Sequence, residues 1–413
     1  MAHTLPDGRT VAVAHDYLTQ RGGAERVVLS LAKAFPGAPV HTTLHEPDAT
    51  YPELAALEVR ASSLNRFAPA RRSYRSALPL LPFAASSVRP TEDVVVASTS
   101  GWAHGFRAEG DVVAYCHAPA RWLYQSEAYL GGSLRSSAKG LALAALKPSL
   151  LAWDRRAAAR PAKYLCNSRV VRDRIGEAYG IEAEVVPPPH SMDVHAPRES
   201  VPELEDWAGE GYLLVVSRLL PYKNVDVLVE AVRGTDERLV VVGTGPEKAR
   251  LQAIAPQNVK MVEGLSEAQL RWVYAQARLL LAPSLEDYGL TPLEAAAFGV
   301  PTVSLGAGGY LDTVVDGLTG LFVEAPEVGA FRAGIAEATG RSWDTAAVLA
   351  QADAFGEERF GERIREAVSS LRPRQVRTAP ARPRVVLGAR TPAPAWAARV
   401  ASGLAIAPAT VTD

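Results

Sequence analysis

Short apolar segments alternate with helical segments along most of this chain, and this alternation constrains the fold more than any other feature. Apolar stretches at 10–18 (TVAVAHDYL), 93–99 (DVVVAST) and 111–117 (DVVAYCH) read as strands, while 19–35 carries a helical pattern of apolar residues. Strands that are apolar on both faces and are connected through helices form parallel sheets covered on both sides. The sequence therefore predicts an α/β fold.

The same pattern starts twice, which predicts two domains. A proline-rich stretch with few apolar positions interrupts it, and a new series begins with the strand-like segment 212–219 (YLLVVSRL). A chain of 413 residues also exceeds one ordinary hydrophobic core. The expected parts are a first domain at 1–190, a linker at 191–208, a second domain at 209–350, a helical segment at 351–371 that crosses back to the first domain, and a disordered Pro/Arg/Ala-rich tail at 372–413.

Composition excludes several classes of protein. The formal net charge of -1 gives no overall attraction to nucleic acid. The two cysteines, Cys116 and Cys166, lie in apolar runs and are expected to be buried free thiols in a reducing compartment. The N-terminus lacks the pattern of a signal peptide, and no apolar run reaches the roughly 18 residues that span a bilayer. We expect a cytoplasmic protein.

The segment 282–304 (APSLEDYGLTPLEAAAFGVPTVS) contains the most informative candidate site. Thr291 and Glu294 match a capping box, which by itself accounts for Glu294 as a structural residue. That interpretation leaves Glu286 and Gly289 unexplained. A glycine-containing loop between a strand and a helix start favours an anion such as a diphosphate, so the carboxylates are expected to bind hydroxyl groups instead.

Two cations follow the first strand of the second domain, in 217–224 (SRLLPYKN). Arg218 and Lys223 are expected at the carboxyl end of that strand, where a fork and a point charge suit a diphosphate. An ordinary solvated pair of charges is the alternative. The presence of an anion-type helix start in the same domain favours the diphosphate.

Several motifs resemble those of retaining family 4 glycosyltransferases with the GT-B architecture, in the order in which that family has them. In the second domain they are SRLLPYKNVDVLVEA, VVGTGPE, VEGLSEAQL, the segment 282–304 and GAGGYLDTVVDGLTGLFV. In the first domain, HDYLTQRGGAERVV resembles the family's glycine loop, and YCHAPARWLYQ resembles a segment of bacterial mannosyltransferases of surface polysaccharide assembly. The resemblance covers about residues 10–370 and implies two Rossmann-like domains facing each other across a cleft.

The resemblance implies a role for each matching residue. Arg218 and Lys223 bind the donor diphosphate, Glu286 binds the transferred sugar, Glu294 holds the ribose, and His117 lies beside the anomeric carbon. Asp16 and His104 face the acceptor, although a turn cap and a polar loop residue are equally good interpretations. The remaining donor-side positions are Gly22, Gly23, Gly264, Leu265, Gly289, Leu290 and Thr291.

The implied chemistry uses a nucleotide sugar as substrate and no cofactor or metal ion. No Asp-x-Asp element stands in a suitable place, and the two cations supply positive charge. Retention without double displacement suits Glu286 as a hydroxyl binder rather than a nucleophile. The chain departs from the family pattern at Asp312, where glutamate is common, and at 187–193 (PPPHSMD).

A basic and apolar segment at 64–89 predicts a membrane-facing surface. Its arginines surround the apolar run LPLLPF, a combination that suits an anionic membrane surface; they are Arg66, Arg71, Arg72, Arg75 and Arg89. A solvated helix followed by a buried loop is the alternative. We expect peripheral binding at the inner face of the plasma membrane.

Three functions remain in order of preference. The first is transfer of a hexose, with mannose from GDP-mannose preferred, to a lipid-linked or glycan acceptor in cell-envelope or exopolysaccharide synthesis. The second keeps the fold and uses a UDP-sugar. The third is an inactive binding subunit, which the intact set Arg218, Lys223, Glu286 and Glu294 disfavours.

Overall fold

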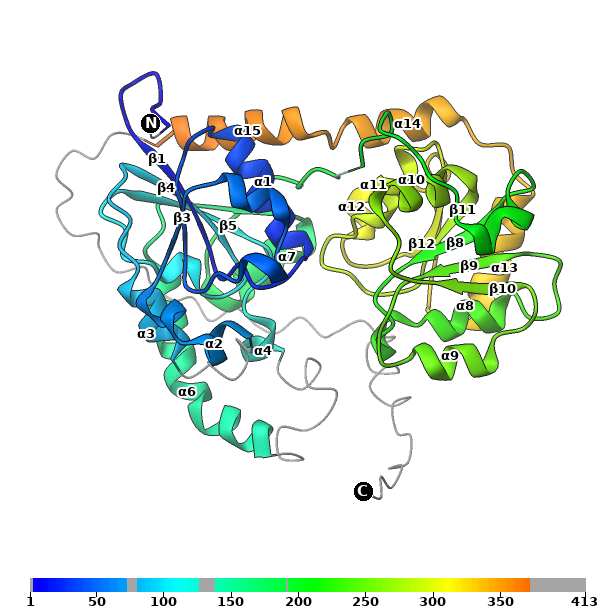
Figure 1. Cartoon of the computed structure of the whole chain (residues 1–413), viewed down its shortest axis with the longest axis horizontal. Coiled ribbons are helices and arrows are strands. Elements are labelled where there is room, and N and C mark those ends of the chain that lie inside the picture. Colours follow the sequence, from blue (N-terminus) through cyan, green and yellow to red (C-terminus); the bar gives the residue numbers. More distant parts are fainter. Residues whose placement is uncertain (1–2, 73–79, 126–137, 191, 372–413) are drawn as a thin grey trace. The chain divides into compact units, whose positions relative to one another are not determined.

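The computed structural model describes residues 3–72, 80–125, 138–190 and 192–371, and it contains two parallel β-sheets (Figure 1). The first sheet has seven strands in the order β3-β2-β1-β4-β5-β6-β7, and the second has six in the order β10-β9-β8-β11-β12-β13. Neighbouring strands within each sheet run parallel. The α/β prediction is confirmed. The predicted tail at 372–413 lies outside the described residues.

The first sheet and its helices are built from residues 11–185. The strands are β1 (Val11–His15), β2 (Val40–Thr42), β3 (Val59–Ala61), β4 (Val94–Thr99), β5 (Asp111–Cys116), β6 (Lys163–Cys166) and β7 (Glu184–Val185). The helices are α1 (Gly23–Ala34), α2 (Ala68–Arg72), α3 (Leu81–Ser87), α4 (Arg121–Tyr124), α6 (Ala138–Ala158) and α7 (Arg169–Tyr179).

The second sheet and its helices follow from residue 212. The strands are β8 (Tyr212–Val216), β9 (Leu239–Val242), β10 (Val259–Val262), β11 (Ala277–Ala282), β12 (Thr302–Leu305) and β13 (Gly320–Val323). The helices are α8 (Val225–Ala231), α9 (Lys248–Ile254), α10 (Glu267–Gln276), α11 (Thr291–Ala296), α12 (Tyr310–Thr313), α13 (Val328–Thr339), α14 (Thr345–Asp353) and α15 (Glu357–Ser369).

Both faces of each sheet are apolar because successive side chains point to opposite faces and both are covered by helices. In β1, Val11 and Val13 pack with α1 and α15, whereas Ala12 and Ala14 pack with α3. The second sheet shows the same division: Leu213 packs with α8 and α13, and Leu214 packs with α10. This double burial explains why the strands read as continuous apolar runs.

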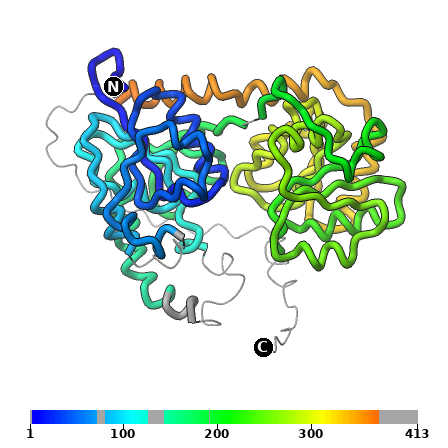
Figure 2. Tube along the Cα trace, viewed as in Figure 1, coloured from blue at the N-terminus to red at the C-terminus, as the bar shows by residue number. Residues whose placement is uncertain are grey.

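The last helix, α15, packs against α1 of the first domain. Phe360, Ile364 and Val368 are buried in the same core cluster as Val28 and Leu31. The orange end of the described chain therefore lies beside the blue α1, as Figures 1 and 2 show.

The packed part of the second domain begins inside the stretch expected to be a linker. A 3-10 helix at Pro202–Trp207 buries Leu204 and Trp207 in the core cluster that contains Tyr212. Sequence reasoning missed this element because its two apolar anchors are separated by acidic residues. Both cysteines are buried free thiols, as expected.

Candidate functional site

The order of strands in the second sheet reverses between β8 and β11, and the predicted donor-side residues follow these two strands. Arg218 and Lys223 come after β8, and Glu286 and Gly289 come after β11. Ligands of open parallel sheets bind outside the carboxyl ends of the strands at such a reversal. The fold thus brings Lys223 and Glu286, which are 63 residues apart in the chain, together at the carboxyl ends of these strands.

The loop after β8 is held by close backbone packing. Gly243 and Gly245 follow β9 with positive φ values of 151° and 159°, and a Cβ on either would collide with the carbonyl oxygens of Ser217 and Leu219. Asn224 ends the loop in the left-handed region, φ 53°, and its Nδ2 donates to Pro283 O at 3.2 Å. The loops after β8 and β11 are therefore fixed against each other.

Lys223 and Glu286 form an ion pair at this edge. Lys223 Nζ donates to Glu286 Oε1, and the Ser284 hydroxyl donates to the same oxygen at 2.6 Å. Both charged side chains are largely shielded, with 13% and 19% of the Lys223 and Glu286 side chains exposed. Sequence reasoning chose both residues but assigned them to separate parts of a ligand, and it did not foresee their pairing.

Arg218 lies in the same loop with a different environment. It is exposed, and its guanidinium makes no hydrogen bond or ion pair with another of the residues the structure describes. A guanidinium in this state presents all of its donors to solvent. The site therefore combines one paired cation with one open cation.

Glycines shape the loop after β11. Gly289 has φ 88°, and a Cβ there would lie 2.5 Å from the ring of buried Tyr310. Gly309 N donates to Glu286 O at 2.9 Å, which packs the loop 306–309 on the loop 286–289. Within the described ranges, the N–H groups of Gly289 and Leu290 make no hydrogen bond to the protein. These amides stay available, as the sequence predicts for an anion seat.

The capping-box prediction at Thr291 and Glu294 is wrong. Helix α11 begins at Thr291, its N-cap is Leu290 in a helical conformation, and no side chain caps it. The Glu294 carboxylate instead accepts a hydrogen bond of 2.7 Å from the Tyr274 hydroxyl of α10. Burial raises the pKa of Glu294, and this hydrogen bond acts in the opposite direction.

Gly264 and Leu265 lie after β10, which β9 separates from β8 at the reversal. Gly264 is exposed with φ 68° and has open space around it. Leu265 packs partly into the core, and Ser266 caps α10 with a complete capping box to Gln269. The local structure is a strand-to-helix turn, and contact with the donor stays a prediction.

In the first domain, the expectation that Asp16 and His104 face an acceptor is not met in this structure. Each is 2% exposed. Asp16 accepts from the backbone N–H groups of Ser100, Trp102 and Ala103 at 2.7, 3.1 and 2.6 Å, so it caps the loop after β4. A carboxylate placed before a tight loop satisfies these amides, and its burial keeps it from the surface.

His104 is enclosed on both ring nitrogens. Nδ1 lies 3.0 Å from the Thr99 hydroxyl and Nε2 lies 3.1 Å from Asp154. Asp154 in turn accepts from the Tyr124 hydroxyl at 2.7 Å. These contacts make His104 part of a buried network under α6. The sequence could not show this because Asp154 lies 50 residues away from it.

His117 directly follows β5 and belongs to a cluster that the sequence analysis did not identify. Its Nε2 lies 2.8 Å from the Ser98 hydroxyl, and Ser98 lies 2.9 Å from His15 Nδ1. His15 in turn faces the buried carboxylate of Glu25, with 3.9 Å between Nε2 and Oε1. Burial, assisted by the charge of His15, lowers the pKa of His117 to about 3.

Gly22 and Gly23 do not have the conformation for which glycine is required. Gly22 has φ -133°, and Gly23 is not among the residues with positive φ. A Cβ on Gly22 would instead lie 2.6 Å from Glu25 Oε2. The glycine pair therefore leaves room for a buried carboxylate at the start of α1, and approach to a donor stays a prediction.

Hydrogen bonds connect the two sheets' loops within the compact unit formed by residues 1–376. Asp287 accepts from Arg121 and Arg174, and the Ser168 hydroxyl donates to Asp287 O at 2.5 Å. Asp312, which departs from the family pattern, accepts from Arg169. Sequence reasoning missed these residues because each pair joins distant parts of the chain.

The predicted membrane surface at 64–89 is partly exposed. Phe67, Leu80 and Phe83 are 56%, 48% and 76% exposed, whereas Leu81 is buried. Arg66 and Arg89 are exposed, but Arg71 is held by Glu46. Arg75 and the side chain of Arg72 lie outside the described residues. Over the described part of the chain, no helix combines the length and apolarity needed to cross a bilayer.

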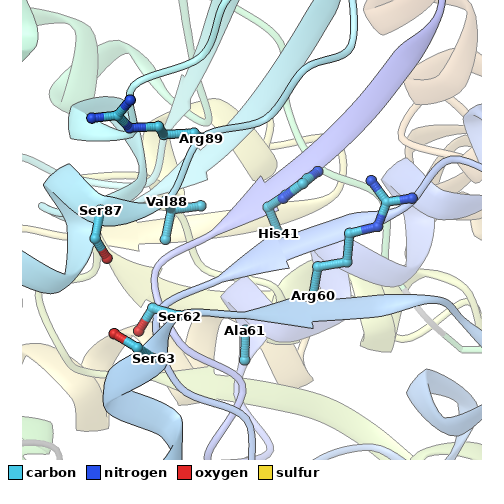
Figure 3. A pocket seen from close by; sticks show the side chains of 8 residues that line it. All are labelled: His41, Arg60, Ala61, Ser62, Ser63, Ser87, Val88 and Arg89. Carbon is cyan, nitrogen blue, oxygen red and sulfur yellow. The ribbon is translucent and has the colours of Figure 1, made fainter.

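A cavity of about 270 Å³ lies beside this segment, away from the edge that carries Lys223. Figure 3 shows the residues that line it: His41, Arg60, Ala61, Ser62, Ser63, Ser87, Val88 and Arg89. Arg60 and His41 both contact Glu92, at 2.9 and 3.2 Å. Glu92 thus compensates the charge of Arg60, whereas Arg89 is exposed. Among the described residues, no three His, Cys, Asp or Glu side chains gather as metal ligands do.

Family comparisons match both domains. Residues 21–194 match the family described as Glycosyltransferase Family 4, and residues 199–351 match Glycosyl transferases group 1. The two matches together cover most of the chain.

Curated relatives match shorter stretches. A GDP-mannose-dependent alpha-(1-6)-phosphatidylinositol monomannoside mannosyltransferase of Mycolicibacterium smegmatis is 31% identical over 41% of this chain and 51% of the relative. The D-rhamnosyltransferase WbpZ of Pseudomonas aeruginosa is 30% identical over 43% of this chain and 48% of its own length. A glycogen synthase of the same species is 39% identical over 27% of this chain and 24% of its own length. The chain thus spans about half, or less, of the length of these relatives.

Solved structures show the same fold at low sequence identity. The Anabaena protein Alr3699/HepE, solved in complex with UDP-glucose, is 17% identical with a TM-score of 0.62, over 87% of this chain and 100% of that chain. The lipopolysaccharide outer core galactosyltransferase WaaB is also 17% identical, with a TM-score of 0.59, over 87% of this chain and 99% of its own. Two Rossmann-like parallel-sheet domains with these neighbours confirm the GT-B fold. The two matched domains and this fold identify the chain as a member of the family 4 type of glycosyltransferases.

Proposed function

We propose that this protein transfers a hexose from a nucleotide sugar to an acceptor hydroxyl, with the donor bound by the second domain. The observation that carries the proposal is the cluster of Lys223, Glu286 and Arg218 at the reversal of the second sheet. A diphosphate attracts both cations, and it draws Lys223 away from Glu286. The released carboxylate then accepts hydrogen bonds from sugar hydroxyls.

The reaction needs positive charge where the leaving group develops negative charge. The bond between the anomeric carbon and the diphosphate oxygen breaks, and the acceptor oxygen forms the new bond. The acceptor proton passes to the departing diphosphate. Arg218 and Lys223 stabilise that diphosphate electrostatically, and the proposed mechanism proceeds with retention and without a metal ion.

GDP-mannose is the preferred donor in this proposal, because GDP-mannose-dependent mannosyltransferases are among the relatives at about 30% identity. A UDP-sugar is the second candidate, since the HepE structure of the same fold contains UDP-glucose. The third candidate is an inactive binding subunit. The open guanidinium of Arg218 favours an active enzyme over that third candidate.

Donor turnover tests the proposal. The full-length protein is incubated with GDP-mannose, UDP-glucose or ADP-glucose and a mixture of lipid-linked glycans, and the products are measured by mass spectrometry. We expect one added hexose and the matching nucleoside diphosphate with GDP-mannose. NMR of the product then gives the anomeric configuration, and an inverted product contradicts retention. Nucleotide binding without product from any donor supports the inactive subunit.

We further propose a lipid-linked or glycan acceptor of envelope or exopolysaccharide synthesis, reached from the inner face of the membrane. The exposed Phe67, Leu80 and Phe83, together with Arg66 and Arg89, supply the apolar and basic groups that bind an anionic bilayer. We expect the protein to float with anionic vesicles at low salt. Replacing the four arginines from 66 to 75 by glutamate should abolish this; equal flotation contradicts the proposal.

A further inference from the structure

Three side chains missed by sequence reasoning form a continuous polar chain behind His117. Glu25 comes from the first turn of α1, His15 ends β1, and Ser98 lies near the end of β4. Their exposed fractions are 1%, 2% and 0%. Buried polar groups at this depth need defined hydrogen bonds, so the position of each proton can be deduced from its partners.

His15 Nδ1 is placed to donate a hydrogen bond. It lies 3.1 Å from the carbonyl oxygen of Ser98, which only accepts hydrogen bonds, and 2.9 Å from the Ser98 hydroxyl oxygen. The other ring nitrogen, Nε2, faces the Glu25 carboxylate at 3.9 Å. If Nε2 were unprotonated, its lone pair would point at a lone pair of the Glu25 carboxylate, which is unfavourable. The arrangement is favourable when Nε2 is also protonated, and His15 is then a cation beside an anion.

The charges around His15 agree with this assignment. Burial alone lowers the pKa of His15, but Glu25, followed by Asp16, raises it above its ordinary value. Ser98 O adds to the increase, and the ring of His117 lies 6.4 Å from that of His15. The charges of Glu25 and Asp16 thus both favour the protonated form of His15.

The Ser98 hydroxyl links the protonation of His15 to that of His117. Since its oxygen already accepts from His15 Nδ1, its own proton needs an acceptor. Among the described residues, the acceptor within reach is His117 Nε2 at 2.8 Å. Nε2 must then hold a lone pair, which in a neutral imidazole places the proton on Nδ1.

We propose that Glu25, acting through His15 and Ser98, is a positioning residue that holds His117 as the neutral Nδ1–H tautomer. The unpartnered Oε2 of Glu25, buried beneath Gly22, provides a second observation, because a structural carboxylate at a helix start normally caps a backbone N–H. That His117 uses its Nδ1–H toward the donor sugar rests on the proposed function. The tautomer itself does not.

Imidazole ¹⁵N NMR of the full chain at neutral pH tests the proposal. His117 is assigned with a His117→Gln variant. We expect a protonated Nδ1 and an unprotonated Nε2 for His117, and two protonated nitrogens for His15. Glu25→Gln should leave His15 with a single proton. That proton can then sit on Nε2, so that Nδ1 accepts from the Ser98 hydroxyl and the Nε2–H tautomer of His117 becomes possible. Ser98→Ala should release His117 while His15 stays a cation.

Ser30→Ala is a matched control, because Ser30 is also buried and lies on α1, where its hydroxyl donates to Glu357 at 3.1 Å. It should leave both histidine signals unchanged. An Nε2–H tautomer of His117 in the wild type overturns the positioning role of Glu25, even if the protein is an active transferase. A tautomer that either Glu25→Gln or Ser98→Ala leaves unchanged overturns it as well.

Activity provides the second readout. Glu25→Gln and Ser98→Ala are expected to lower kcat by about 10- to 100-fold, because small errors in orientation are costly in catalysis, while KM for the donor changes little. A protein that binds no nucleotide sugar but shows the expected tautomer would refute the proposed function. The positioning of His117 by Glu25 would still hold. A KM effect with an unchanged kcat contradicts the positioning role.

Discussion

The starts of α1 and α11 share the order of strand, loop and helix but have different electrostatic surroundings. Each follows a strand and a glycine-containing loop, the pattern that predicts an anion site. At α1, the buried Glu25 carboxylate lies in the first turn under Gly22. In the loop before α11, Glu286 is neutralised by Lys223 and the Glu294 side chain turns to Tyr274.

This difference shows that a glycine loop before a helix does not by itself mark a phosphate site. A carboxylate in the first turn disfavours phosphate. At α1 this carboxylate is buried directly beneath Gly22, whereas at α11 the Glu294 side chain accepts a hydrogen bond from Tyr274. The loop before α11 keeps free N–H groups and has a lysine beside it. The diphosphate is therefore expected on the second domain.

The largest effect should come from Lys223→Ala. It removes one cation and leaves the shielded Glu286 carboxylate facing the diphosphate, and truncating one partner of a buried charge pair costs about 2–5 kcal/mol. Turnover and nucleotide affinity should each fall by about 30-fold or more. Steady-state kinetics and calorimetric titration with the donor nucleotide measure these losses.

Lys248→Ala provides the control. Lys248 belongs to the same domain and pairs with Glu263 at 2.6 Å, but at a more exposed position. It should change affinity little. If both variants behave alike, Lys223 has no special role and the comparison between the two helix starts fails.

Alanine in place of glycine should lower the free energy of unfolding by different amounts in three loops. Gly289→Ala combines a φ of 88° with a close approach to buried Tyr310, and we expect a loss of unfolding free energy of about 1–3 kcal/mol. Gly264→Ala shares the positive φ, at 68°, without a neighbour and should cost about 1 kcal/mol. Gly22→Ala meets only the end of the Glu25 side chain.

Denaturant titration measures all three variants. The expected order of destabilisation is Gly289, then Gly264, then Gly22. A Gly22 variant as damaged as the Gly289 variant would mean that the α1 loop is as tightly constrained as the loop before α11.

The smallest effect concerns pH and His117. Its pKa of about 3 in the folded protein lies below the ordinary value of 6.5. The unfolded chain therefore takes up a proton as the pH falls below 6.5, while folded His117 does not until about 3. The stability that His117 contributes is complete above pH 6.5 and is lost as the pH falls toward 3.

His117→Gln should remove this contribution, so its unfolding free energy should fall less steeply with acid than that of the wild type. One proton accounts for a difference in slope of at most about 1.4 kcal/mol per pH unit. Urea unfolding between pH 7 and 5 measures it. Parallel curves for the two proteins would show that folded His117 titrates normally.

The sequence predicts the sheets well because strands that are buried on both faces consist of nearly continuous apolar residues, as in Val11–His15. It also selects Lys223 and Glu286, since both follow strands whose carboxyl ends share an edge. It does not reveal their ion pair, which depends on the fold of two loops. Glu25 and His15 escaped notice because burial, not spacing, makes them unusual.

Asp16 and Glu294 have partners that their sequence positions do not reveal. Each has a residue type and position that suit a site, but the structure directs Asp16 to loop amides and Glu294 to Tyr274. A carboxylate binds the donors that tertiary packing brings to it. Sequence position alone does not identify those donors.

A thermal-shift panel on the wild-type protein and Lys223→Ala tests the central claim most directly. GDP-mannose, UDP-glucose and ADP-glucose are compared at saturating concentration, and a ligand at 100 times its Kd should stabilise the wild type by about 2.7 kcal/mol. We predict that GDP-mannose raises the Tm of the wild type most and shifts the Tm of Lys223→Ala much less. If no nucleotide sugar raises the Tm of the wild type, or if both proteins shift equally, a diphosphate site at Lys223 is contradicted.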